Sequence, residues 1–428
     1  MAPQFSRRSM LFGGSAALGL GALGLSACGG IGGGGNIRFA WYGGAERQQA
    51  YMELLEIFEE DHEITVEPEY ADYEPYQDRM ATQFAAGDGP DLFFLAGFNI
   101  LEWHEAGQLH ELDEFIDDGI IDLSDMDQQL VEDWRIDGRI TAMPYAYWNS
   151  VVRSNRDLAQ QYGIEIPDDE TWTWDDFAEI AREFSEASDD GLFGAVYGAY
   201  DDLPFNSFLR QIGQELFTVD GEVGFDADGV GEWLDLWERM RESGAAMSLQ
   251  QQEGVIPDLE GLDDRVLFRT GNANHLANAQ PAADSELDIH LVPTVPDPSP
   301  GHRYLHVVRF GMYSDTPEPE ATAELINFLL NSEHVPPLVG MNQGLPVSQR
   351  LQEVAREHAD ETDQKVIDLI EREAAMEMRP RAEVPAGAGS WRNMMARAIE
   401  AVAIEGSPIS TESERFVNEL TEAVERGS

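Results

Sequence analysis

The chain of 428 residues carries 27 Lys and Arg residues against 81 Asp and Glu residues, which gives a formal net charge of −54 at pH 7. So acidic a chain cannot neutralise a phosphate backbone, and nucleic acid is therefore excluded as a partner. The single cysteine excludes an internal disulfide framework and a thiolate metal cluster within the chain. The length predicts two or three domains, and the 20 Phe, 9 Trp and 12 Tyr residues supply enough apolar bulk for packed cores.

The distribution of charge indicates the medium in which the protein works. Nearly all basic residues are arginine, with Lys365 the only lysine, and acidic residues are spread along the whole chain. An acidic tail would instead concentrate its charge in one block. The composition predicts a halophilic protein, because molar salt shortens the Debye length to about 3 Å and screens the self-repulsion. The alternative is an ordinary acidic protein.

The first 28 residues predict an export signal. Residues 6–12 contain the pair Arg7-Arg8, an apolar Gly/Ala-rich run follows at 18–25, and residues 25–28 read Leu-Ser-Ala-Cys. The run is too short for a permanent membrane span. The arginine pair resembles a twin-arginine signal, and the Leu-Ser-Ala-Cys sequence resembles a lipoprotein box ending at a lipidated Cys28. The alternative for Cys28 is an incidental free thiol. The glycine-rich residues 29–35 predict a flexible tether.

The mature chain begins with alternating strands and helices. Residues 36–42 alternate apolar and polar side chains as a strand does, residues 46–60 place apolar residues on one helical face, and residues 64–66 resume the strand pattern. A second helix is predicted over residues 76–86, ending at Gly87, and a buried strand follows at 90–95. This alternation predicts an α/β fold with mainly parallel sheets and helices on their faces.

The pattern continues to the C-terminus. Helices are predicted near residues 174–185, 229–243, 320–331, 363–374 and 391–405, and strands near 289–292 and 305–313. Trp233, Trp237 and Met240 have helical spacing and are predicted to lie in a core. Pro336-Pro337 is predicted to end a helix.

Several phrases in this order resemble the extracytoplasmic solute-binding proteins that feed sugars to ABC importers, the family that includes maltose-binding protein. The most specific phrase is Ala-Ala-Gly-Asp-Gly-Pro-Asp-Leu at residues 85–92, after the helix at 46–60 and the strand at 64–66. Further phrases lie at 106–113 (AGQLHELD), 137–145 (DGRITAMPY), 171–177 (TWTWDDF), 320–329 (EATAELINFL) and 344–347 (GLPV).

The resemblance implies a type II periplasmic-binding-protein-like fold, with two α/β lobes joined by hinge strands that close over a ligand. The crossings between lobes are expected near Ala146, Val308 and Leu345. The N-terminal lobe is then predicted to contain residues 36–146 and 308–345, and the C-terminal lobe residues 147–307 and 346–428.

A sugar-binding cleft needs aromatic faces for pyranose rings and planar polar groups for hydroxyls, supplied by loops at strand ends. Candidates for cleft or core are the aromatic residues at the end of the first strand and in a turn of the second lobe. The strand end at 145–149 favours the cleft. Arg309, in an otherwise apolar strand, has either a cleft role or an ion pair with a nearby carboxylate. The predicted ligand-binding residues are Trp41, Tyr42, Glu46, Tyr145, Trp148, Asn149, Tyr200, Asp201, Arg309, Phe310 and Trp391.

No catalytic residue, cofactor or metal site is predicted. Carboxylates are too abundant for any pair to indicate a glycosidase. His104-Glu105 begins a zinc-protease-like motif, but Gln108 stands where the second histidine would be required. No Gly-x-Ser-x-Gly elbow and no Walker lysine motif occurs.

The function predicted from these observations is that of a non-enzymatic receptor. It is anchored to the outer face of the cell membrane through lipidated Cys28 only, acts as a monomer, captures a sugar or oligosaccharide and delivers it to an ABC permease. The alternatives are the same fold binding an anionic or phosphorylated non-sugar solute, and a surface glycan hydrolase.

Overall fold

The computed structural model describes residues 35–95, 100–188, 191–253 and 262–427, and residues 35–428 form one compact unit. The predicted signal with Cys28, and the predicted tether up to residue 34, lie outside the described residues. No helix in the described ranges is long and apolar enough to cross a membrane.

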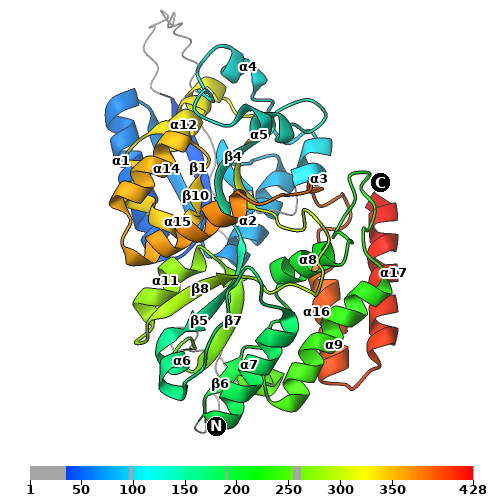
Figure 1. Ribbon diagram of the computed structural model, residues 1–428. Coiled ribbons are helices and arrows are strands. Elements are labelled where there is room, and N and C mark those ends of the chain that lie inside the picture. The colour runs from blue at the N-terminus through cyan, green and yellow to red at the C-terminus, as the bar shows by residue number, and fades with distance from the viewer. Residues whose placement is uncertain (1–34, 96–99, 189–190, 254–261, 428) are drawn as a thin grey trace, which may run out of the picture. The chain divides into compact units, whose positions relative to one another are not determined.

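Two β-sheets organise this unit (Figure 1). The first sheet has the order β10-β4-β9-β3-β1-β2 and the second the order β6-β7-β5-β8. Strands of the first sheet are β1 (Asn36–Tyr42), β2 (Thr65–Ala71), β3 (Leu92–Leu95), β4 (Ala142–Trp148), β9 (His306–Met312) and β10 (Leu345–Pro346). Strands of the second are β5 (Ser150–Asn155), β6 (Phe193–Ala195), β7 (Val266–Asn272) and β8 (Leu287–Leu291).

The predicted α/β fold with two sheets is confirmed, but the expectation of mainly parallel pairing is wrong. Strand β1 runs parallel to β2 and β3, and β6 runs parallel to β7, whereas β3–β9, β4–β9, β4–β10, β5–β7 and β5–β8 are antiparallel. The difference arises because β4 and β9 connect directly with strands of the other sheet. A strand that enters without a helical crossover is free to run antiparallel to its neighbour.

Helices cover both sheets. Between β1 and β4 lie α1 (Ala45–His62), α2 (Tyr73–Ala86), α3 (Ile100–Glu105), α4 (Asp113–Asp117) and α5 (Gln128–Asp133). The return to the first sheet adds α12 (Pro319–Asn331), α13 (Val335–Val339), the 3₁₀ helix η2 (Gly340–Gln343) and α14 (Gln349–His358). The second sheet is accompanied by α6 (Arg156–Tyr162), α7 (Trp174–Ala187), α8 (Asp202–Gln211), α9 (Ala227–Ser243), α10 (Leu249–Glu253), α11 (His275–Ala282), α15 (Glu361–Ala374), α16 (Trp391–Ala403) and α17 (Ile409–Gly427).

Local sequence signals explain several helix ends. Gly87 ends α2 in the left-handed conformation, with φ of 68°, and its N–H donates to Phe84 O at 3.1 Å. Thr173 and Asp176 form a reciprocal capping box at the start of α7. The prediction that Pro336-Pro337 ends a helix is wrong, because the prolines lie in the first turn of α13, where a missing N–H costs nothing.

The chain passes between the sheets at three places. Asn149 alone separates β4 from β5, residues 292–305 join β8 to β9, and residues 359–360 join α14 to α15. Beyond Leu345, helix α14 still contacts β10, whereas α15 contacts β8 and α11. We therefore propose that the last crossing between lobes lies after α14 rather than at Leu345.

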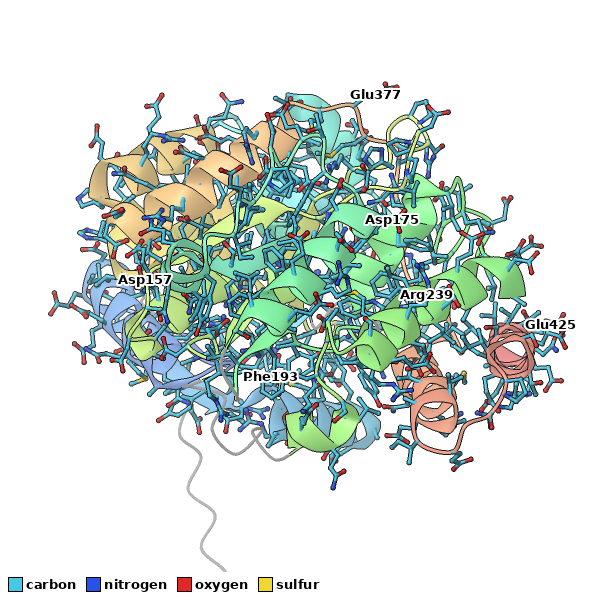
Figure 2. All side chains as sticks on the ribbon, turned by 60° about the horizontal axis from the view of Figure 1, so that its bottom comes forward. Asp157, Asp175, Phe193, Arg239, Glu377 and Glu425 are labelled. Atoms are coloured by element: carbon cyan, nitrogen blue, oxygen red, sulfur yellow. The ribbon has the colours of Figure 1, made fainter. Side chains whose placement is uncertain are left out.

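One apolar core packs the first sheet together with residues of β5, β8, α11 and α15, and a second core packs α7, α8, α9, α16 and α17 around the second sheet. Trp233 and Trp237 are fully buried and Met240 is 1% exposed in the core of the second sheet, as the helical spacing predicts. The surface, by contrast, is rich in carboxylates. The exposed side chains include Asp157, Asp175, Glu377 and Glu425, and Figure 2 shows Glu377 and Glu425 at the edge of the molecule.

Candidate functional site

A cavity of about 570 Å³ lies where elements of the two sheets meet. The first sheet contributes the ends of β1 and β4 and the strand β9, and the second contributes α8 and the end of β7. Helices α1, α2, α11 and α16, the 3₁₀ helix η2 and the segments 215–217 and 381–384 also contribute to the wall. A cavity of this size and position is typical of a small-molecule site in an α/β protein.

Trp148 supplies an aromatic face on this wall. Its ring stacks on the imidazole of His306, with centroids 4.4 Å apart and planes inclined by 15°. His306 Nε2 lies 2.7 Å from the hydroxyl of Tyr304. Burial lowers the pKa of His306 well below its ordinary value, and the nearby Arg381 lowers it further. The imidazole is therefore neutral, and it packs against one face of the Trp148 indole.

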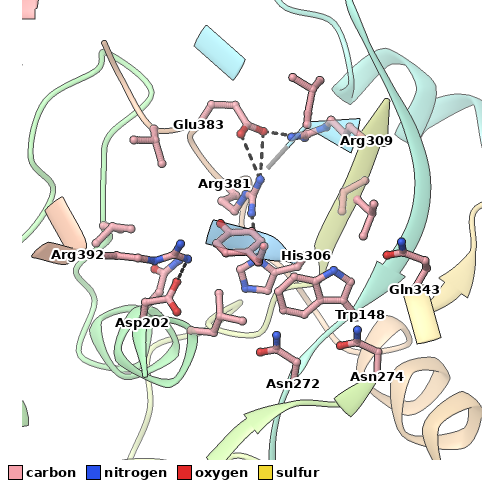
Figure 3. A pocket seen from close by; sticks show the side chains of 18 of the residues that line it. Trp148, Asp202, Asn272, Asn274, His306, Arg309, Gln343, Arg381, Glu383 and Arg392 are labelled. Carbon is pink, nitrogen blue, oxygen red and sulfur yellow. Dashed lines mark hydrogen bonds and ion pairs between the residues drawn. The ribbon is translucent and has the colours of Figure 1, made fainter. Parts of the chain in front are cut away.

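Two arginines share one carboxylate beside Trp148 (Figure 3). Arg309 Nη2 donates to Glu383 Oε1 at 2.7 Å, and Arg381 Nη2 donates to the same oxygen at 3.1 Å. Arg381 Nη1 lies 3.3 Å from His306 Nδ1. Burial opposes ionisation of Glu383, but Arg309 and Arg381 lower its pKa to about 2. The cluster of Arg309, Arg381 and Glu383 therefore carries one surplus positive charge, and we call it the arginine cluster.

A third arginine of the cavity wall, Arg47, lies in the first turn of α1. Arg47, on α1, donates from Nη1 to Tyr42 O at 2.8 Å, from Nε to Asn342 Oδ1 at 2.6 Å and from Nη2 to Asn342 O at 3.0 Å. Gly43 makes room for it, because a Cβ there would lie 2.6 Å from Arg47 Cδ, and its φ of 144° disfavours other residues. The turn after β1 is thus shaped around Arg47.

Arginine and carboxylate also meet on the opposite wall. Arg392, in the first turn of α16, pairs with Asp202 of α8, and its guanidinium carbon lies 5.6 Å from the ring centroid of Trp391. Arg210 donates to several backbone carbonyls, among them Arg379 O at 2.7 Å, and lies 3.7 Å from a Glu215 carboxylate oxygen.

Amide side chains complete the wall. Asn272, Asn274 and Gln343 line the cavity, and Figure 3 shows them grouped near Trp148. Within the described part of the chain, Asn274 Oδ1 and Gln343 Nε2 are buried without a hydrogen-bond partner. Because leaving a buried polar atom unpaired is costly, these atoms are suited to hydrogen bonds with a ligand.

The structure brings four of the residues predicted from the sequence to this cavity. Tyr42, Trp148, Arg309 and Trp391 line it. Both alternatives considered for Arg309 apply, because it pairs with Glu383 and also lies on the cavity wall. That these residues bind a ligand stays a prediction.

Three other predicted residues lie in the core of the first sheet and do not line the cavity. Trp41 and Phe310 are fully buried, and Tyr145 is 4% exposed. The rings of Tyr145 and Phe310 pack 4.8 Å apart. Their neighbours Tyr42 and Arg309 face the cavity because successive strand residues point to opposite faces.

The remaining four predicted residues do not line the cavity. Glu46 lines a separate cavity of about 240 Å³. Asn149 is fully buried and donates to Glu373 Oε2 at 2.5 Å. Tyr200 packs against the core of the second sheet, and the partly buried Asp201 accepts a hydrogen bond from Thr270.

Several cavity residues have no counterpart in the sequence prediction. They include Arg47, Asn272, Asn274, His306, Gln343, Arg381, Glu383 and Arg392. Arg381 and Glu383 lie in a segment without periodic pattern. Among the described residues, no three His, Cys, Asp or Glu side chains gather as a metal site.

Comparison with known proteins identifies the family. The model of the bacterial extracellular solute-binding protein family matches residues 44–335, which is more than half of the chain. The chain belongs to this family. The resemblance seen in the sequence is thereby confirmed.

Solved structures share the fold. A periplasmic oligogalacturonide-binding protein from Yersinia enterocolitica, in complex with saturated digalacturonic acid, has a TM-score of 0.79 at 17% identity and covers 92% of this chain and 99% of its own. An ABC substrate-binding protein from Listeria monocytogenes, in complex with cycloalternan, has a TM-score of 0.77 at 19% identity, over 91% of this chain and 99% of its own.

Two curated relatives match part of the chain. The erythritol/L-threitol-binding protein of Mycolicibacterium smegmatis is 26% identical over 224 residues, which is 47% of this chain and 46% of the relative. A melibiose/raffinose/stachyose-binding protein of Bacillus subtilis is 24% identical over 176 residues, 40% of this chain and 38% of the relative. The match therefore spans less than half the length of either relative.

Proposed function

We propose that this chain is an extracytoplasmic receptor that binds a sugar or oligosaccharide in the cavity between the two sheets and delivers it to an ABC permease. The observation that carries the proposal is the stacked pair of Trp148 and His306 on the wall of a cavity of about 570 Å³. The receptor acts as a monomer and performs no chemistry on its ligand.

The cavity wall suits the two faces of a pyranose. An aromatic ring packs on the apolar face of the sugar, and planar amide and guanidinium groups pair with its hydroxyls. Trp148 supplies the ring, and Asn272, Asn274 and Gln343 supply amides within the same wall. The names of the relatives add support, because the curated ones bind a tetritol or galactosyl oligosaccharides and the solved ones were captured with saccharides.

The functional test is a tryptophan fluorescence titration of the mature chain in molar salt with mono- and oligosaccharides. We expect saturable binding of at least one saccharide, with the sugar recovered unchanged by chromatography. Release of shorter products would support a glycan hydrolase instead. Silence across the panel would contradict sugar binding and favour a non-sugar solute in the same cavity.

Attachment to the membrane is proposed on the sequence at residues 25–28. Lipidation of Cys28 after export through the twin-arginine route would hold the receptor at the outer face of the cell membrane. Cys28→Ser should release the protein into the medium. Retention of this variant in the membrane fraction would show that another contact holds it.

A further inference from the structure

The cavity reverses the charge balance of the whole chain. The chain has 81 acidic residues and 27 basic residues of the Lys and Arg type. Its cavity wall, however, holds five arginines (Arg47, Arg210, Arg309, Arg381 and Arg392) and three carboxylates (Asp202, Glu215 and Glu383). A wall of this kind presents positive charge to a ligand inside an otherwise strongly negative protein.

The ion pairs among these side chains show where positive charge exceeds negative charge on the cavity wall. Arg392 pairs with Asp202, and this pair is balanced. Glu215 is shared by Arg210 at 3.7 Å and Arg379 at 3.6 Å. Glu383 is likewise shared, by Arg309 at 2.7 Å and Arg381 at 3.1 Å. One surplus positive charge therefore lies in the arginine cluster.

Arg47 carries a further surplus positive charge on the cavity wall. Its printed hydrogen bonds go to Tyr42 O and to the oxygens of Asn342, all of them neutral acceptors. Within the described residues, no carboxylate lies within 4.0 Å of its guanidinium nitrogens as an ion pair. Two of its five N–H groups remain after these three hydrogen bonds.

The two histidines of the cavity wall, His275 and His306, add no positive charge to it. Desolvation at the cavity wall lowers the pKa of His275, and Arg153, Arg269 and Arg47 contribute in the same direction. Burial likewise lowers the pKa of His306, with Arg381 as the next cause. Both imidazoles are neutral at ordinary pH, so the surplus charge of the wall belongs to the arginines alone.

We propose that the saccharide bound in this cavity carries carboxylate groups, as uronic-acid units do, and that Arg47 and the arginine cluster receive them. This inference rests on the proposed function of saccharide binding and specifies its ligand class. Guanidinium groups match carboxylates in planar, two-pronged geometry. Each centre carries a single surplus charge, which fits one carboxylate, whereas a phosphate monoester would bring a charge of about −1.5 to −2.

Molar salt does not remove the attraction between these arginines and a bound carboxylate. At molar salt the Debye length is about 3 Å, so charges at a distance no longer interact, but direct contacts in a partly buried cavity are screened much less. At molar salt the arginines therefore attract the carboxylate only when the two groups are in direct contact. Acidic saccharides would not be repelled at a distance by the negative surface.

The test uses calorimetric titration of the mature chain in molar salt. The probes are the trisaccharides of galacturonate, glucuronate and mannuronate, their methyl esters and the corresponding neutral trisaccharides. We expect at least one acidic trisaccharide to bind about tenfold or more tightly than its ester, in keeping with a charge-assisted hydrogen bond. The ester keeps the ring and removes only the charge.

Variants locate the contact. Arg47→Gln should weaken binding of the acidic trisaccharide by about tenfold and leave binding of the ester within about twofold. Arg47→Lys, which keeps the charge, should lose less. The control is Arg239→Gln on α9, which removes the same charge from an exposed side chain that pairs with Asp235. If Arg47→Gln fails to fold, Arg381→Gln tests the second centre in the same way.

The outcomes separate the two claims. If neutral trisaccharides or esters bind as tightly as the acids, the inference is overturned and saccharide binding stands. If a sugar phosphate such as glucose 1-phosphate displaces every acidic trisaccharide, the assignment to carboxylate is overturned. If no saccharide of either kind binds, the inference and the proposed function both fail.

Discussion

Two groups of side chains that are adjacent in the sequence have different surroundings in the structure. Trp41 and Phe310 are fully buried in the core of the first sheet, whereas their neighbours Tyr42 and Arg309 line the cavity. The alternation of strand residues separates them, because successive side chains point to opposite faces of a sheet. The comparison teaches that a strand end supplies packing and recognition from consecutive positions, so that substitutions one residue apart should affect different properties.

The largest effect is expected in the core. Trp41→Ala removes a fully buried indole that packs against Phe39 and Tyr51, with ring centroids 5.0 and 5.4 Å away. The variant should lose about 3 to 5 kcal/mol of free energy of unfolding, as large-to-small core substitutions do. Urea unfolding at constant molar salt measures it. A loss of less than about 1 kcal/mol of free energy of unfolding would contradict the assignment of Trp41 to the core and Tyr42 to the cavity wall.

An intermediate effect is expected where packing and recognition meet. Glu383→Gln leaves Arg309 and Arg381 without their shared carboxylate. Removing one partner of a buried ion pair costs about 3 to 5 kcal/mol, and partial exposure at the cavity reduces this to about 2 kcal/mol. The same urea titration measures the change, with Arg239→Gln as the matched surface control.

The same carboxylate predicts a pH dependence. The pKa of Glu383 is lowered to about 2 in the folded protein, so the folded state binds fewer protons than the unfolded state between that pH and its ordinary value near 4.5. The stability contributed by Glu383 is therefore present above about pH 4.5 and lost as the pH falls toward 2. Glu383→Gln should lose less stability than the native chain over this range. Equal losses in the two proteins would contradict the assignment.

The smallest effect on folding is expected at the cavity wall. Trp148→Ala should change the free energy of unfolding by about 1 kcal/mol or less, because the ring is only partly buried and stacks on one side against His306. Saccharide affinity should fall about tenfold, the loss expected for one aromatic stacking contact of about 1 to 1.5 kcal/mol. Fluorescence of the remaining tryptophans or calorimetry measures it, and unchanged affinity would remove Trp148 from the site.

The sequence predicted the elements of the fold better than its contacts. The strand at 36–42, the helix ended by Gly87 and the core position of Trp233 follow from periodicity and from the left-handed preference of glycine, which are local properties. The antiparallel pairing of β3 with β9 is not local, because it joins residues more than 200 positions apart.

The residues of the candidate site also fall into a group that the sequence predicts and a group that only the fold brings together. Tyr42, Trp148, Arg309 and Trp391 were found because aromatic residues and an arginine at element ends are visible in the sequence. Whether Trp41 or Tyr42 faces the cavity depends on which face of β1 the helices cover. Arg381 and Glu383 lie in a segment without regular structure, and only the fold brings it beside β9.

The most direct test of the account is a crystal structure of the mature chain with the tightest-binding saccharide of the titration panel. The account predicts the sugar in the cavity, with a ring packed on Trp148 and, for an acidic saccharide, a carboxylate in contact with Arg47 or the arginine cluster. A saccharide bound elsewhere on the molecule, with this cavity filled by water, would contradict it.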